Sequence, residues 1–158
     1  MKKIFAIILA LTLCAGLCAC GMSVNIEDTN GDDPSLCSIT EEDIVSGSIG
    51  STTFGSVKTT FNSTTIFKVK KMSGVLTLDT FKSANQNKAY TVTLSSNLVS
   101  GNLRVVLLCD GKYAADFPLN ETQTLVFDNP ECKYELVLAA ESAEFSVEYA
   151  VTEEDIYE

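Results

Sequence analysis

Apolar and polar residues alternate with a period of two along most of the chain after Thr53, which is the pattern of a strand with one buried face. The clearest run places Ala143, Phe145, Val147, Tyr149 and Val151 on one face, and Glu144, Ser146 and Glu148 on the other. Similar runs, rich in Val, Thr, Phe, Tyr and Leu, predict further strands at about 65–70, 75–81, 89–95, 102–109, 112–117, 122–127 and 133–139.

Short polar breaks separate these runs, and they contain turn-forming residues. Asp110-Gly111 lies between two apolar runs and predicts a tight hairpin, because both central positions of a type I′ turn need positive φ. Ser73-Gly74 and Ser100-Gly101 are expected to be turns as well. No helical pattern is long enough for a parallel crossover, so the fold class predicted is all-β: an antiparallel, jelly-roll-like β-sandwich of about eight or nine strands.

The first residues have the pattern of a secretory signal peptide. Met1-Lys2-Lys3 gives a positive start, and an apolar run follows that ends in small residues. The stretch 4–19 is shorter than the roughly 20 residues that a membrane-spanning helix needs. We therefore expect the protein to be exported.

The segment Leu17-Cys18-Ala19-Cys20, followed by Gly21, resembles the lipobox of bacterial lipoproteins, although Cys18 departs from the usual Ser, Ala or Thr. The resemblance implies that residues 1–19 are removed and that Cys20 carries the lipid. A diacylglyceryl group would hold the protein stably on the extracytoplasmic face of the cell membrane. The alternative is ordinary cleavage after Ala19, which would release the protein with a free thiol at Cys20.

Composition divides the remaining chain into three parts. Residues 20–52 are acidic and rich in Gly and Ser, which predicts a tether, with capping-box spacing at 38–41 for one short helix. Residues 53–151 form the predicted sandwich, and 152–158 an acidic tail. Without residues 1–19 the chain carries 9 basic and 21 acidic residues, a net charge of −12. That charge disfavours nucleic acid and anionic membrane surfaces as partners.

The later strands carry a second resemblance. The runs "YTVTL", "GNLRVVLLCDGK" and "CKYELVLAAESAEFSVEY" are similar to the C-terminal part of secreted bacterial β-sandwich modules of the pre-peptidase C-terminal kind. Cys132 stands where a glycine usually precedes the tyrosine strand. The resemblance implies a jelly-roll-like sandwich with a targeting or binding role and no chemistry of its own.

The chain contains no histidine, which excludes Ser-His-Asp and Cys-His catalysis and the common imidazole zinc sites. The acidic stretch 27–33 has calcium-type oxygen ligands, but its glycine precedes the last two Asp residues and breaks the EF-hand order. We expect a solvated linker there, and no enzyme activity, metal or cofactor.

Cys109 ends one predicted strand and Cys132 begins another. In an exported protein they could form a disulfide that closes a loop of about 23 residues and contributes about 3 kcal/mol. The alternative is two buried free thiols. Cys37 is left over in the tether.

Residues 57–112 have a local charge of +6, with Lys68, Lys70 and Lys71 close together. These lysines could form a basic patch that meets an acidic wall polymer. The alternative, which we favour, is that Lys68 and Lys70 pair across strands with Glu144 and Glu148, and that the other lysines are ordinary edge-strand residues that prevent aggregation. Sugar binding loses support because the chain has no Trp and its Phe residues mostly fall on inward positions.

The sequence thus predicts a membrane-anchored bacterial surface lipoprotein whose sandwich is a non-catalytic binding module. Its partner would be an extracellular protein, a glycan or a wall polymer. The alternative is a structural or assembly component of the cell envelope without a soluble ligand.

Overall fold

The computed structural model describes residues 37–82, 88–129 and 131–155. In chain order their elements are α2 (Glu41–Ser46), β1 (Thr52–Phe54), β2 (Val57–Phe61), β3 (Thr64–Phe81), β4 (Lys88–Cys109), β5 (Lys112–Phe117), β6 (Thr122–Phe127) and β7 (Tyr134–Asp155). Within this part of the chain no helix has the length and apolar character to span a membrane. Cys20, the stretch 27–33 and the predicted tether up to residue 36 lie outside the described residues.

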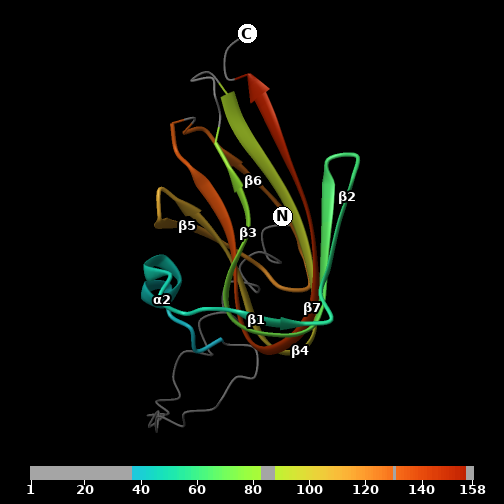
Figure 1. The fold of residues 1–158 in the computed structure, drawn as a ribbon. Coiled ribbons are helices and arrows are strands. Elements are labelled where there is room, and N and C mark those ends of the chain that lie inside the picture. Colours follow the sequence, from blue (N-terminus) through green and yellow to red (C-terminus); the bar gives the residue numbers. More distant parts are fainter. Residues whose placement is uncertain (1–36, 83–87, 130, 156–158) are drawn as a thin grey trace, which may run out of the picture. The chain divides into compact units, whose positions relative to one another are not determined.

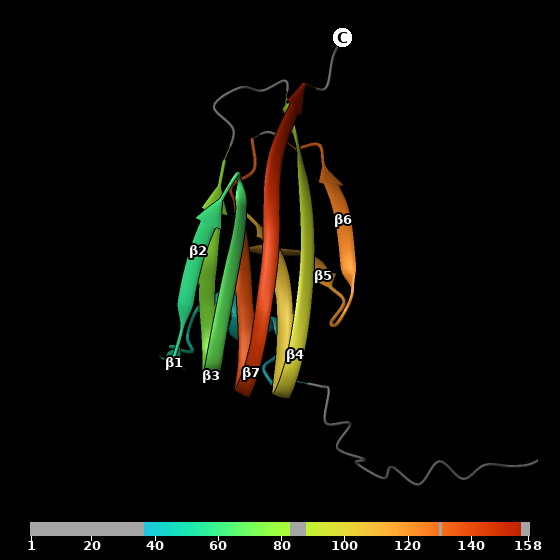
Figure 2. The ribbon, with the colours of Figure 1, turned by 90° about the vertical axis from the view of Figure 1, so that its right-hand side faces the viewer.

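Three long antiparallel strands, in the order β3-β7-β4, form the centre of the fold. Each strand bends near its middle, so the sheet folds over into two layers (Figures 1 and 2). The first layer contains β2, the first half of β3, the second half of β7, the first half of β4, and β6. The second layer contains β1, the other halves of the same long strands, and β5. The predicted antiparallel, all-β sandwich is confirmed.

The bends lie where the sequence analysis expected turns, and that expectation is wrong. β3 runs through Gly74 and β4 runs through Gly101, with breaks in register around both residues. Both glycines have positive φ, and a Cβ on Gly101 would lie 2.6 Å from the carbonyl oxygen of Ser142. β7 pairs with β3 and β4 on both sides of the bends, so each strand continues through its bend. Segments that were predicted as two separate strands are therefore one long strand, and the described residues form seven strands.

Two tight hairpins each connect a short strand to a long one. Asp110 and Gly111, with φ of 50° and 70°, join β4 to β5, which confirms the predicted turn. Asn62 and Ser63, with φ of 47° and 65°, join β2 to β3. Positive φ at both central residues matches the right-handed twist of the paired strands.

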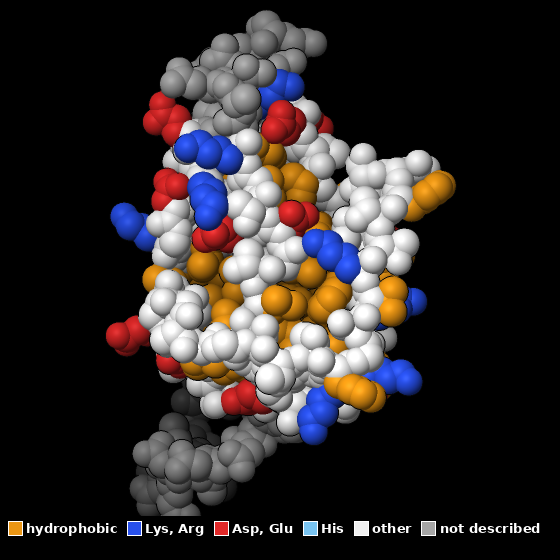
Figure 3. Space-filling view, viewed as in Figure 1, with side chains coloured by type: hydrophobic (Ala, Val, Ile, Leu, Met, Phe, Trp, Pro, Cys, Tyr) orange, Lys and Arg blue, Asp and Glu red, His pale blue; other side chains and the backbone are white. Residues whose placement is uncertain are grey.

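The main core lies between the two layers, where Figure 3 shows hydrophobic side chains gathered in the middle of the view. Its largest fully buried members include Tyr90, Met72, Leu94, Leu103, Leu107, Leu136 and Leu138. Two polar contacts also join the layers. Lys58 Nζ donates to the carbonyl oxygen of Leu78 at 2.7 Å, and the Tyr149 hydroxyl donates to Asp79 Oδ2 at 2.8 Å.

Residues 37–52 do not belong to an unpacked tether, which corrects the predicted boundary. Ile39 and Ile44 are buried on the second layer, and α2 begins after Thr40, whose side chain accepts a hydrogen bond from the Asp43 N–H. The predicted short helix is present, but its capping box joins Thr40 and Asp43, two residues after the predicted spacing at 38–41. The predicted acidic tail also needs correction, because β7 continues to Asp155 and pairs with β4 there.

Candidate functional site

The outer face of the second layer is covered by the protein's own chain. Ile39 and Ile44 pack there against Val106, Leu108, Val137 and Ala139 from β4 and β7. Figure 1 shows α2 beside this layer, on the side away from β2. These contacts cover the middle of this face with residues of the same chain.

Two charged residues hold the segment before α2 on the second layer. Arg104 donates to Asp116 Oδ2 at 2.8 Å and to the carbonyl oxygen of Ile39 at 3.4 Å. Glu141 accepts hydrogen bonds from the Ser38 hydroxyl, from the Ser38 N–H at 3.2 Å and from the Asn102 amide at 3.1 Å. These bonds favour the carboxylate and lower the pKa of Glu141, while the hydrogen bond to Asp116 raises the pKa of Arg104.

The outer face of the first layer, which we call the open face, has no covering segment among the described residues. Figure 2 views it directly, with the strands in the order β2-β3-β7-β4-β6. Strand pairing arranges its side chains in rows, because residues in register stand side by side. The two central rows are Thr124-Thr93-Ala150-Thr64-Phe61 and Thr122-Ser95-Glu148-Ile66-Thr59.

A groove of about 470 Å³ crosses the open face near the bend, and we call it the lysine groove. Lys68 and Lys70 lie on one side and Glu144 on the other, with Gly55, Val57, Val69, Val99, Phe145 and Ser146 completing the lining. The stem of Lys70 lies directly over Gly55. A Cβ added to Gly55 would be 3.1 Å from the Lys70 Cγ and Cδ atoms. Gly55 also has a positive φ of 63°, so its lack of a side chain serves both the turn and the position of Lys70.

Two adjoining hollows, of about 300 and 260 Å³, lie farther along the same face, and both are lined by Thr64 and Glu148. The first also includes Thr93, Ser95, Thr122, Tyr149 and Ala150, and the second Thr59, Phe61, Asn62 and Ile66. We call them together the Phe61 hollows. They combine hydroxyl groups, one carboxylate and one exposed aromatic ring, that of Phe61.

The predicted basic patch is brought together only in part. Lys68 and Lys70 share the lysine groove, but Lys71 lies at the bend opposite Phe54 of β1 and does not line the groove. The favoured pairing with Glu144 and Glu148 is not formed. Lys68 stands opposite Ser146, and none of the ion pairs among the described residues joins these lysines to either glutamate.

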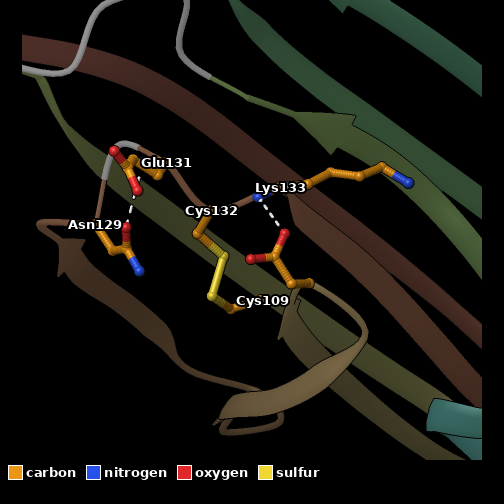
Figure 4. The surroundings of a disulfide bond; sticks show 6 residues. Cys109, Asn129, Glu131, Cys132 and Lys133 are labelled. Atoms are coloured by element: carbon orange, nitrogen blue, oxygen red, sulfur yellow. Dashed lines mark hydrogen bonds between the residues drawn. A yellow bond between two sulfur atoms is a disulfide. The ribbon is translucent and has the colours of Figure 1, made fainter.

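Cys109 and Cys132, for which the sequence left a disulfide and two free thiols open, are joined by a disulfide with 5.6 Å between their Cα atoms (Figure 4). The bond connects the end of β4 to the loop before β7. Asp110 supports this connection: its N–H donates to the Lys133 carbonyl oxygen at 2.9 Å, and its carboxylate accepts from the Lys133 N–H at 3.0 Å. The sulfur atoms lie close to the Asp110 carboxylate, but bonded sulfurs offer no thiolate to a metal.

Cys37 is a free, half-buried thiol beside the cluster under α2. Burial raises the pKa of this thiol, because the thiolate would lose solvation there. Its reactivity in the native protein should therefore depend on whether α2 stays docked.

Sequence reasoning missed the exposed phenylalanines. Phe61 is 74% exposed at the end of β2, and Phe54 is 71% exposed on β1, so neither points inward. Both lie on short edge strands that were not predicted, because runs this short show little alternation. The Asn62-Ser63 pair between two threonine-rich runs was the available signal for the β2–β3 hairpin.

Comparison with protein-family models, with curated proteins and with solved structures finds no match to this chain. The open face offers hydroxyls, two glutamates, two lysines and exposed apolar side chains, which are groups suited to non-covalent binding.

Proposed function

We propose that this protein is a bacterial surface lipoprotein, anchored through Cys20 to the extracytoplasmic face of the membrane, whose sandwich is a non-catalytic binding module. The difference between the two outer faces carries the binding part of this proposal. One face is covered by residues 37–50 of the same chain, whereas the open face presents three adjoining depressions. Because the other outer face is occupied by the protein's own chain, we expect a partner to bind the open face.

Strand order supports the open face as a preorganised surface. Its central strands are held on both sides by long antiparallel neighbours, and β7 pairs with β3 and β4 along most of its length. Side chains on such strands need little ordering when a partner binds, which lowers the cost of association. The anchor is supported by the lipobox resemblance of Leu17-Cys18-Ala19-Cys20.

Two measurements test the proposal. The anchor predicts a diacylglyceryl-modified Cys20 in the N-terminal peptide of protein purified from native membranes, and mass spectrometry would detect it. An unmodified Cys20 in protein recovered from the medium would contradict the anchor.

Binding is tested by co-sedimentation of the protein with detergent-extracted envelope fragments from the same cells. Thr93→Arg places a bulky charge in the middle of the open face, and Val45→Arg makes the same change on the exposed side of α2. We expect the first variant to lose binding and the second to retain it. Equal binding by both variants, or no binding by the wild type, would contradict the proposal, and co-purification of one stoichiometric protein would favour an assembly role.

A further inference from the structure

We propose that the Phe61 hollows bind a glycan, with Phe61 as the platform for a sugar ring and Glu148 as the main hydrogen-bond acceptor. This inference rests on the proposed binding function and names the chemical class of its ligand. It departs from the sequence analysis, in which the inward placement of phenylalanines argued against sugars.

The first observation is the position of Phe61. Its side chain is 74% exposed, although phenylalanine gains free energy from burial. It lies at the end of the hairpin whose two central residues, Asn62 and Ser63, both have positive φ without being glycine. An apolar ring beside polar groups suits a ligand that is itself amphipathic, as the two faces of a sugar ring are.

The second observation is the carboxylate of Glu148. It is exposed at the wall shared by both hollows, and none of the hydrogen bonds or ion pairs among the described residues involves it. Its neighbours in register are Ile66 and Ser95. An unpaired carboxylate accepts strongly from the hydroxyl or amide donors that a sugar carries.

The third observation is the chemistry of the remaining lining. Thr59, Thr64, Thr93, Ser95 and Thr122 supply hydroxyls that can donate or accept, and Asn62 supplies an amide. No lysine or arginine lines either hollow. A polyanion would therefore meet Glu148 without compensation there, whereas a neutral, donor-rich polymer would not. The row from β2 to β6 crosses five strands, about 19 Å, which is room for several linked rings.

The test uses the full-length protein in detergent and envelope fragments treated in three ways before co-sedimentation. Periodate cleaves the vicinal diols of sugars, protease removes protein, and hydrofluoric acid removes phosphodiester polymers. We expect periodate to abolish binding, and protease and hydrofluoric acid to leave it intact. Loss with protease or hydrofluoric acid alone would overturn the glycan while leaving the binding module standing. No binding to untreated fragments would instead contradict the proposed function itself.

Two pairs of variants locate the site. Phe61→Ala should weaken binding by about tenfold or more, and Phe54→Ala, which removes an equally exposed ring outside the hollows, should not. Glu148→Gln should weaken binding about fivefold, whereas Glu144→Gln, on the same strand but in the lysine groove, should have little effect. Equal effects within either pair would overturn the site. So would a wild-type dimer that Phe61→Ala dissociates in analytical ultracentrifugation, because a second copy would then cover the ring.

Discussion

Replacing Ile44 by Ala tests whether α2 is a packed part of the fold. Ile44 is 3% exposed and contacts the cluster on the second layer. Truncating a buried isoleucine to alanine usually costs 2–5 kcal/mol, and a short surface helix can avoid part of that cost by undocking. We therefore expect the docking equilibrium to lose about 2 kcal/mol, which opens the segment about 30-fold more often.

Cys37 reports this opening directly, because its thiol is half-buried under the same segment. Alkylation by iodoacetamide, followed peptide by peptide with mass spectrometry, should be at least about tenfold faster at Cys37 in the variant than in the wild type. Val45→Ala is the matched control, because Val45 is the next residue of the helix and is 41% exposed. Equal alkylation rates in both variants would refute the packing of α2 and restore the tether predicted for this segment.

Three further predictions concern stability. The Cys109–Cys132 bond spans 23 positions, and its reduction should lower the free energy of unfolding by about 3 kcal/mol. The melting temperature measured by circular dichroism should then fall by about 10 °C. A change below about 2 °C would contradict this prediction. The pKa of Glu141 is lowered in the native state, so its contribution to folding stability should be present above its ordinary pKa of 4.5 and be lost as pH falls through the native pKa. The difference in melting temperature between wild type and Glu141→Gln should therefore shrink as the pH falls. A difference that stays constant with pH would argue against this role of Glu141. Tyr149→Phe removes the hydroxyl that donates to Asp79 and should cost about 1–3 kcal/mol in urea unfolding. Because burial and Asp79 raise the pKa of Tyr149, the wild type should also lose stability above about pH 10, and the variant should lack this contribution.

The layered β-fold was predictable because its information is local. Alternation along 143–151 fixed which side chains face the core, and the Asp110-Gly111 pair fixed one hairpin. The same local information could not separate a turn from a bend. Ser73-Gly74 and Ser100-Gly101 look like turns, and only their pairing with β7 on both sides, far away in sequence, keeps the strands continuous.

The candidate site was less predictable, because it depends on which face stays uncovered. The high acidic content of residues 20–52 predicted a solvated tether, so the burial of Ile39 and Ile44 on the second layer was not expected. Lys68 and Lys70 were identified from charge alone, but the exposure of Phe61 depends on β2 being an edge strand. Sheet order is a property of long-range pairing, which a single sequence does not display.

Nuclear magnetic resonance mapping of bound envelope material tests the central claim most directly. Isotope-labelled protein would be titrated with the soluble fraction released from envelope fragments, and amide shifts would be followed residue by residue. Binding to the open face should shift amides along β2 and in the halves of β3, β4 and β7 that form this face, and should leave α2 and β5 unchanged. Shifts confined to α2 and β5 would contradict it, because the partner would then bind the face that the chain already covers.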